Sequence, residues 1–566
     1  MKSWKTHIVP LAFFTLLTIV YTFPLIINIG KLLPGPPEDN MAYLWNFWWV
    51  KKAVFQSALS PFFTHYLYYP TGVSLVYQDF TYFNLLLALP LSLVFNDAVA
   101  YNLPLILSYL FAALAMYALV WHLTEDKWAA VVAGTVFAFC PYHIEQFDHH
   151  LGLANIQFLP LVALMVIKQL QAPSSRNIFW GGLFITLASL SNWYYLVFSA
   201  VFAAFFVVYH YFIEKEQLIK AFPGLFLMFV MSATLLSPLL YPMLASKSIA
   251  AKGGFSAARC SSDLLGFFIP SLKHPLARWL GLEKIYRNFP CFIWEITVYL
   301  GYTVCFLGMY AWLKVKSPLV RFFGWAALFF LVLSLGPTLH FNGKTVLESV
   351  KLPYYWLIEL IPFFKQVRTP ARFTILSTMC ISVLAGYAAR DILSRQESPK
   401  MVGGLILLLI VIEHFAYPLK TSDLYQLTKA DEIGRILVQD KEECAVLELP
   451  FTVNYIFGGM SMLRQTRHEK KILLGYIARI PDEAMSFIKQ SPLNRLLTRP
   501  GQADTAYFER LAPFLKKNKI KYIILSRYLF GAQNQAYVNF VSQSLQNNFS
   551  WKREIGNSVT IYRVYD

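Results

Sequence analysis

The sequence predicts a polytopic α-helical membrane protein with about 11 transmembrane helices and a small C-terminal α/β domain. Hydrophobic residues make up 57% of the 566 positions and charged residues only 14%, which is more apolar surface than a water-soluble globule can bury. After residue 420 the composition becomes that of an ordinary soluble protein. We therefore expect a transmembrane domain over residues 1–419 and an outer domain over residues 420–566.

The membrane spans are predicted from apolar segments of roughly 17 to 22 residues, because only a helix satisfies its own backbone groups inside the hydrocarbon. The predicted spans are residues 8–28, 101–121, 129–140, 154–170, 178–192, 195–213, 222–244, 292–313, 320–336, 371–389 and 401–418. The third and fifth are short for a span and are expected to be tilted or broken. The first lacks a cleavage site and is expected to be retained.

The distribution of basic residues predicts the orientation. Lys and Arg gather in the short connections on one side: Lys2, Lys5, Lys127, Lys168, Arg176, Lys215, Lys220, Lys314, Lys316, Arg321, Arg390, Arg395 and Lys400. Short basic loops stay in the cytoplasm, so the N-terminus is predicted to be cytoplasmic and the C-terminal domain extracytoplasmic. The long segments 29–100, 140–153, 245–291 and 337–370 then lie outside, and loops of this length usually carry function.

Several classes of function lack their sequence signals. There is no GxxxxGK followed by Ser or Thr and no GxGxxG, which argues against a nucleotide-fuelled enzyme. No clustered basic face suggests nucleic-acid binding. The six cysteines have no zinc-ligand spacing. Cys260 and Cys291 share one outer segment and could form a disulfide, although cysteines at an unconstrained spacing are more often unpaired.

The C-terminal segment has the alternation of a small α/β domain. The runs "CAVLELPF", "KIKYIILS" and "SVTIYRV" are strand-like, and "AYFERLAPFLKKN" is an amphipathic helix. Such a domain could bind an acceptor, or it could pack as a lid over the membrane domain.

Two adjacent acids, Glu38 and Asp39, lie in the first outer segment in "PGPPEDNMAYLWNFWWVKK". The tryptophans that follow predict a helix lying along the outer membrane surface, because Trp favours the interface. Asp39 could simply cap this helix, a contribution of about 1 kcal/mol. The alternative is that a carboxylate at the mouth of a membrane cavity serves as a catalytic base or a metal ligand.

The second outer segment, "PYHIEQFDHHLGLAN", groups five polar side chains: His143, Glu145, Asp148, His149 and His150. Carboxylates and imidazoles together could coordinate a divalent ion such as Mg²⁺ or Mn²⁺, or could hold an acceptor. The alternative is a wetted loop whose Asp148 caps the following helix, since no strict ligand spacing such as HExxH is present.

The segment "FKQVRTPARF" places Lys365, Arg368 and Arg372 on the outer side, against the general charge rule. An Arg in a first helical turn opposes the helix dipole and favours an anion nearby, such as the phosphate of a lipid-linked sugar. The alternative is that these side chains reach ordinary lipid headgroups. The basic residues of segment 273–287, beginning with Lys273, would extend the positive surface.

The order of these elements resembles the GT-C superfamily of integral-membrane glycosyltransferases, and within it an uncharacterised bacterial branch. The likeness extends over most of the chain and rests on the stretches "EDNMAYLWNFWWVKKA", "YYPTGVSLVYQDFTYFNLLLALPL", "FAFCPYHIEQFDHHLGLANIQFLPL", "FKQVRTPARF" and "LGYIARIP". The resemblance implies that the first-loop acid of that superfamily corresponds to Asp39, or to Glu38 if the register differs by one. It also implies a second acidic position in a comparable loop and a location in the bacterial inner membrane.

This resemblance implies a hexosyl- or pentosyltransferase that moves a sugar from a polyprenyl phosphate to a glycan, lipid or protein acceptor of the cell envelope. With Asp39 as base and a phosphate that leaves directly, the sugar carbon would be inverted. A transporter or flippase of lipid-linked precursors remains an alternative, although charges within the spans are few and no repeat is found. A non-catalytic envelope-binding protein is a further alternative.

Overall fold

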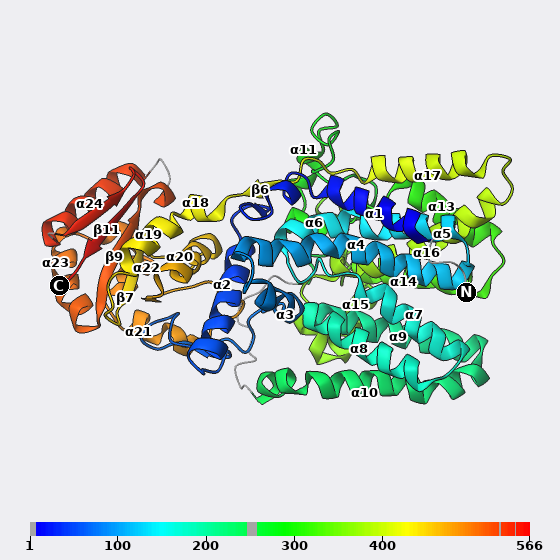
Figure 1. Cartoon of the computed structure of the whole chain (residues 1–566), viewed down its shortest axis with the longest axis horizontal. Helices are drawn as coiled ribbons and strands as arrows, with labels where there is room; N and C mark the ends of the chain where they lie inside the picture. The colour runs from blue at the N-terminus through cyan, green and yellow to red at the C-terminus, as the bar shows by residue number, and fades with distance from the viewer. Residues whose placement is uncertain (1–6, 246–256, 531–533, 550) are drawn as a thin grey trace.

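The computed structural model describes residues 7–245, 257–530, 534–549 and 551–566. The molecule is elongated, with the apolar helices at one end of its long axis and a five-stranded sheet with the C-terminus at the other (Figure 1). Every predicted span overlaps a helix. These helices are α1 (Ile8–Tyr21), α4 (Asp97–Thr124), α5 (Lys127–Ala138), α7 (Phe158–Gln171), α8 (Ser175–Ser191), α9 (Trp193–Ile213), α10 (Lys215–Ala245), α13 (Tyr302–Lys314), α14 (Pro318–Ser334), α16 (Thr374–Leu393) and α17 (Pro399–Glu413).

Within the described residues, four helices are long and apolar enough to cross a membrane by length and composition: Asp97–Thr124, Trp193–Ile213, Lys215–Ala245 and Pro370–Leu393. The predicted span 292–313 begins too early. Its first residues form the short helix α12 (Ile293–Ile296), and the chain then runs extended to Gly301, whose φ of 92° suits glycine. Helix α13 starts only after this glycine.

Polar caps explain why the helices begin where they do. The Asn96 side chain accepts a hydrogen bond from the Val99 backbone N–H (3.0 Å), and Asp126 accepts one from Ala129 (2.8 Å). Ser174 caps α8 in the same way through Asn177. These caps satisfy N–H groups that a helix leaves unpaired in its first turn, so short polar connections are enough to separate long helices.

The segment between α1 and α4 forms a small layer that supports the site. It contains β1 (Leu33–Pro34), α2 (Asp39–Lys51), a π-helical turn (Lys52–Gln56), β2 (Phe63–Thr64), β3 (Val73–Ser74) and α3 (Tyr82–Leu91). Strand β1 pairs antiparallel with β6 (Thr421–Ser422), just beyond the last apolar helix. The chain therefore returns to the first outer segment before it enters the sheet.

The third long outer segment contains a short helix and a disulfide. The helix is α11 (Leu282–Tyr286), and the disulfide joins Cys260 to Cys291. The preference for unpaired cysteines was therefore wrong, because the fold of this loop brings the two Cα atoms to 5.1 Å. The fourth outer segment contains β4 (Leu339–Phe341), β5 (Lys344–Val346) and α15 (Pro353–Leu360).

The five-stranded sheet has the strand order β10-β11-β9-β7-β8. Its strands are β7 (Ala445–Leu449), β8 (Lys471–Ile472), β9 (Ile520–Ser526), β10 (Lys552–Ile555) and β11 (Val559–Arg563). β7 is parallel to both β8 and β9, and β10 and β11 form an antiparallel pair at one edge. The helices of this layer are α18 (Leu424–Thr428), α19 (Ala430–Leu437), α20 (Tyr455–His468), α21 (Ser486–Lys489), α22 (Leu493–Thr498), α23 (Thr505–Lys517) and α24 (Gln535–Asn548). The strand-like runs and the amphipathic helix expected from the sequence lie at β7, β9, β11 and α23.

The sheet shares one hydrophobic core with the first outer segment. Trp45 and Trp49 of α2 are 0% and 1% exposed and pack in the same cluster as Leu447 and Ile523. The indole N–H of Trp45 donates to Gln465 of α20 at 2.7 Å. The expectation that α2 lies along the membrane surface through these tryptophans was therefore wrong for Trp45 and Trp49. An indole can be fully buried when its N–H finds an acceptor, and here α20 supplies one.

Candidate active site

Asp39 is the first residue of α2, and its carboxylate does not cap the helix. The position before it, Glu38, makes no side-chain cap bond. The turn is instead held by Asn40, whose amide donates to the carbonyls of Pro34 (3.0 Å) and Pro36 (2.9 Å) and whose oxygen accepts from the Glu38 N–H. Because Asn40 organises the turn, the Asp39 carboxylate is left for another role and remains 26% exposed.

The polar cluster of the second outer segment divides between the core and the site. Glu145, Asp148 and His149 belong to the short helix α6 (Pro141–His149), and His150 follows it. His143 points away from them and is 0% exposed, with Nδ1 against the Ala138 carbonyl (2.7 Å) and Nε2 against Ser108 (3.1 Å). The structure thus places His143 in the core, as a neutral histidine whose pKa burial lowers to about 4.

His150 connects Asp39 to a buried ion pair. Its Nε2 lies 3.0 Å from a Glu295 carboxylate oxygen, and its Nδ1 lies 3.8 Å from an Asp39 oxygen. Arg372 donates through Nε to the other Glu295 oxygen at 2.9 Å and through Nη2 to the first. Asp39, His150, Glu295 and Arg372 therefore alternate acid and base in one line.

This line gives Arg372 a carboxylate partner and an aromatic one. Its guanidinium lies 4.5 Å from the Tyr194 ring centroid, and the whole residue is 8% exposed. A guanidinium that is buried and held by two hydrogen bonds to Glu295 is poorly placed to receive a lipid phosphate. Arg372 therefore acts as the partner of Glu295 and is not a proposed phosphate ligand.

The titration of this line follows from its contacts. Burial opposes the charged form of His150, but the hydrogen bond and charge of Glu295 outweigh it and raise the His150 pKa above its ordinary value. Burial likewise works against the Glu295 carboxylate, but Arg372 and His150 hold the pKa of Glu295 well below its usual range. Glu295 is therefore ionised at neutral pH.

Asp79 is a further acid of the site, and the sequence analysis did not single it out as a candidate. It accepts a hydrogen bond from the Tyr43 hydroxyl (3.3 Å), and its backbone carbonyl accepts one from Asn46. Burial raises the pKa of Asp79, and the nearby charge of Asp39 raises it further. The pKa of Glu38 is also raised, first by burial, although the nearby His149 opposes the rise. Asp79 lies within the stretch "VYQDFTYFN", so the resemblance to the superfamily was the one signal for it.

The stretch "LGYIARIP" brings two residues of the sheet layer to the site. The pKa of Tyr476 is raised, first by burial and then by the charge of Asp39, so its hydroxyl is close to that acid. Arg479 donates to Gln366 at 2.9 Å and lies over the Tyr77 ring. Burial and then the positive charge of Arg368 lower the Arg479 pKa.

Arg368 and Lys365 are the other basic residues expected here. The Arg368 backbone N–H donates to the Tyr194 hydroxyl (3.1 Å), and its side chain is partly exposed. Lys365 is exposed. Sequence reasoning missed Arg479, because a basic residue of the outer domain gives no local indication that it faces residue 368.

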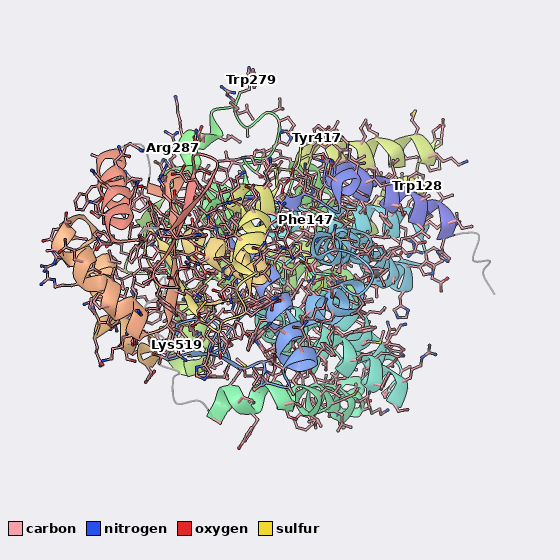
Figure 2. The ribbon with its side chains drawn as sticks, turned by 60° about the vertical axis from the view of Figure 1, so that its left-hand side comes forward. Trp128, Phe147, Trp279, Arg287, Tyr417 and Lys519 are labelled. Carbon is pink, nitrogen blue, oxygen red and sulfur yellow. A yellow bond between two sulfur atoms is a disulfide. The ribbon has the colours of Figure 1, made fainter. Side chains whose placement is uncertain are left out.

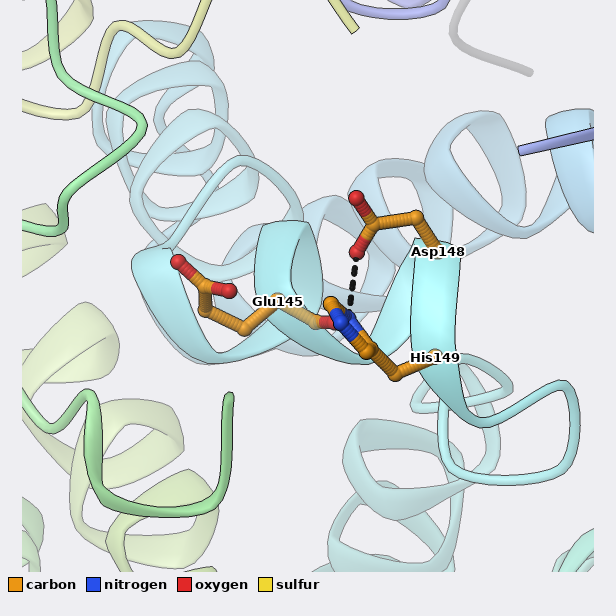
Figure 3. A group of neighbouring side chains, drawn as sticks. All are labelled: Glu145, Asp148 and His149. Carbon is orange, nitrogen blue, oxygen red and sulfur yellow. Dashed lines mark hydrogen bonds and ion pairs between the residues drawn. The ribbon is translucent and has the colours of Figure 1, made fainter. Parts of the chain in front are cut away.

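Three residues form a possible metal-binding group, with one ligand atom from each of Glu145, Asp148 and His149 all within 4.8 Å of one another (Figure 3). The Lys273 ammonium already occupies this group: it lies 2.6 Å from Asp148 and 3.1 Å from Glu145. Asp148 does not cap the next helix, which begins at Phe158 behind Gln157. With a resident ammonium at both carboxylates, the donor set does not fit an added divalent ion.

The fold of the chain is similar to the folds of solved glycosyltransferases. Arabinofuranosyltransferase AftD from Mycobacteria matches 100% of this chain and 42% of its own, at 14% identity and a TM-score of 0.60. The oligosaccharyltransferase of Archaeoglobus fulgidus in the apo form matches 93% of this chain and 70% of its own, at 14% identity and a TM-score of 0.51. At these identities the likeness establishes the fold, and the chain spans less than half of the length of AftD.

The chain belongs to the family described as Domain of unknown function (DUF6311), whose model matches residues 9–413. No curated protein matches the sequence.

Proposed function

We propose that this protein is an inverting glycosyltransferase that moves a sugar from a polyprenyl-phosphate donor to a cell-envelope acceptor at the outer membrane face. The observation that carries this proposal is the convergence on Asp39 of His150 from the second outer segment and Tyr476 from the sheet layer. Residues from two distant parts of the chain thus lie beside the partly exposed carboxylate of a third, an arrangement typical of a catalytic site.

In the proposed reaction, Asp39 accepts the proton of the acceptor hydroxyl as that oxygen attacks the sugar carbon. The bond from this carbon to the donor phosphate breaks, and the phosphate leaves with the bonding electron pair, so the configuration is inverted. A phosphate is already a good leaving group and needs no carboxylic acid to protonate it. The base therefore needs only to be ionised, exposed and correctly oriented.

His150 orients this base. The hydrogen bond to Glu295 holds the imidazole with Nδ1 toward Asp39, and Arg372 fixes Glu295 from the other side. His150 Nδ1 is buried and has no hydrogen-bond partner within the part of the chain that the structure describes. An imidazole so restrained keeps a positive or polar group beside Asp39 and so orients the carboxylate.

Arg368 and Arg479 are the proposed ligands of the donor phosphate. The positive charge of Arg368 disfavours that of Arg479, and a bound anion would relieve this repulsion while accepting paired hydrogen bonds from guanidinium groups. Lys365, exposed on the same segment, would add positive charge toward the lipid headgroup. The acceptor, whether glycan, lipid or protein, would enter from the aqueous side of the sheet layer.

The proposed placement at the outer face combines charge and topology. Asp97 at the start of α4 pairs with Arg467 of the sheet layer at 3.0 Å, so α4 begins on the sheet side. Its 28 residues rise about 1.5 Å each, which carries its end about 40 Å away to the connection before Lys127. The basic connections are thus remote from the sheet, and we place them in the cytoplasm.

The test is to incubate the purified protein with a panel of polyprenyl-phosphate sugars and to measure release of free polyprenyl phosphate. Asp39→Asn is expected to lower the rate at least about 100-fold, because a general base contributes about 10²–10⁴-fold. Glu283→Gln is the matched control, since this acid is 64% exposed in the third outer segment.

Retained transfer by the folded Asp39→Asn variant would defeat the assignment of the base. Movement of a lipid-linked precursor across vesicles without release of polyprenyl phosphate would favour the transporter alternative. Acceptor binding that is unchanged by Asp39→Asn, with no transfer from any donor, would favour the binding-protein alternative.

A further inference from the structure

Lys273 reaches the acidic residues of α6 from a different segment of the chain. It lies within the loop that the Cys260–Cys291 disulfide closes, and its side chain is 19% exposed. The Lys273 ammonium is 2.6 Å from Asp148 Oδ1, 3.1 Å from Glu145 Oε2 and 3.1 Å from the Ile144 carbonyl oxygen. An ammonium group has three N–H donors, and here each has an acceptor.

Both acids have further partners besides Lys273. Ser271, two residues before Lys273, donates its hydroxyl to Glu145 Oε1, so both oxygens of Glu145 have a partner. Asp148 Oδ1 accepts a hydrogen bond from His149 Nδ1 at 2.7 Å and another from Lys273.

His149 faces these acids through a nitrogen that carries a proton. Its Nδ1 lies between two oxygen acceptors, the Glu145 carbonyl (3.0 Å) and Asp148 Oδ1, as Figure 3 shows for the latter. A ring nitrogen between two acceptors must donate, so this nitrogen has no lone pair for a metal ion. The ring also stacks on Trp294 at a centroid distance of 4.2 Å, which fixes its orientation.

A divalent ion would therefore have to displace the ammonium. Oxygen ligands bind such ions at about 2.0–2.6 Å, and the 2.6 Å between Asp148 Oδ1 and the Lys273 ammonium lies at the upper end of that range. An added ion would lie beside the existing positive charge and would lose affinity through repulsion. Burial disfavours the charged form of Lys273, but the charges of Asp148 and Glu145 outweigh it and raise the Lys273 pKa. Burial also disfavours the charged form of Asp148, but the charge of Lys273 outweighs it and lowers the Asp148 pKa.

We propose that Lys273 is the built-in cation of the Glu145–Asp148 pair and takes the place that a divalent metal ion would otherwise fill. Its role is that of a positioning residue: it neutralises α6 and so fixes the start of the His149–His150 segment beside Asp39. This inference concerns cation binding and holds whether or not the protein transfers a sugar.

The experiment measures metal binding and thermal stability of the purified full-length protein after treatment with EDTA. Mn²⁺ is the probe, with binding followed by electron paramagnetic resonance and Tm followed with increasing Mn²⁺. We expect no stoichiometric Mn²⁺ and no Tm shift for the wild-type protein. Lys273→Met should lower Tm without metal and should bind Mn²⁺ at least about tenfold more tightly than wild type, with a concentration-dependent rise in Tm. Lys284→Met, at an exposed lysine of α11, should behave as wild type.

Two results would overturn the proposal. One is a wild-type protein that binds one Mn²⁺ per chain and loses it in Asp148→Asn. The other is a Lys273→Met variant with wild-type Tm and no response to Mn²⁺. If Lys273→Met does not fold, the charge-balanced variant Lys273→Met/Asp148→Asn decides: recovery of folded protein supports the built-in cation, and failure to recover contradicts it.

Discussion

At the scale of single residues, the line from Arg372 through Glu295 to His150 makes stability depend on pH in two directions. The Glu295 pKa is depressed, so its contribution is present above its ordinary pKa of 4.5 and is lost as the pH falls through the lower folded value. The His150 pKa is raised, so its contribution is complete below its ordinary pKa of 6.5 and is lost as the pH rises through the higher folded value. Both contributions are present together between these two pKa values.

The His150 contribution can be isolated by substitution. The Tm of the wild-type protein is expected to fall as the pH rises from 6.5 through the higher folded pKa of His150, because the folded protein gives up the proton held between Glu295 and Asp39 over that range. His150→Gln should lack that part of the decline. His65→Gln, at an exposed histidine, is the control and should keep it. Thermal unfolding scans from pH 5 to pH 9 would give the comparison, and an equal decline in His150→Gln would contradict the role of His150.

At the scale of elements, α2 joins the site to the sheet layer. One end of this helix carries Asp39, and the tryptophans along it pack against the sheet and α20. The stacked rings of Trp45 and Trp49 (5.9 Å, 11°) fill the space between α2 and the sheet layer. The position of the proposed base therefore depends on packing that lies about two to three helical turns away from it.

Removal of the Trp45 ring tests this dependence. Trp45→Ala should destabilise the protein by about 3–5 kcal/mol, since it leaves a cavity and an unpaired Gln465 oxygen. Trp279→Ala should change stability by no more than about 0.5 kcal/mol, because Trp279 is 82% exposed and projects from the surface (Figure 2). Thermal unfolding in detergent measures both, and equal Tm values for the two variants would show that α2 is not held by Trp45.

At the scale of the whole molecule, the division at residue 420 is a boundary in composition but not in packing. Residues 42–89 and 433–562 contribute to one hydrophobic cluster, and β1 pairs with β6 across the boundary. The sheet layer also supplies Tyr476 and Arg479 to the site. Of the two roles considered for the outer domain, packing over the first outer segment is therefore observed directly, and acceptor binding stays a prediction.

A chain that ends at residue 419 is expected to be unstable as a consequence. Truncation would expose the apolar face of α2, including Trp45 and Trp49, to water. We expect aggregation on size-exclusion chromatography in a detergent that keeps the full-length protein monodisperse. A single sharp peak from the truncated chain, with native helix content, would show that the two layers fold independently.

Much of the architecture could be predicted because it depends on local pattern. Each span corresponds to a helix, since a long apolar run has few other ways to satisfy its backbone. The strand runs at β7, β9 and β11 were recognised from β-branched and aromatic residues, and Asp39 and the 143–150 cluster were recognised from charge in an apolar chain. The sequence by itself thus determined the elements and most of the candidate residues.

The tertiary structure alone decided which of those residues meet. His143 and His150 have the same side chain seven positions apart, yet one lies in the core and the other beside Asp39, because His143 lies within α6 whereas His150 follows the end of that helix in extended backbone. Arg372 was expected to bind phosphate and instead pairs with Glu295, and Lys273 reaches acids more than a hundred residues earlier in the chain. Charge neutralisation inside a folded protein depends on distances across the packed structure, and a local sequence pattern contains no information about those distances.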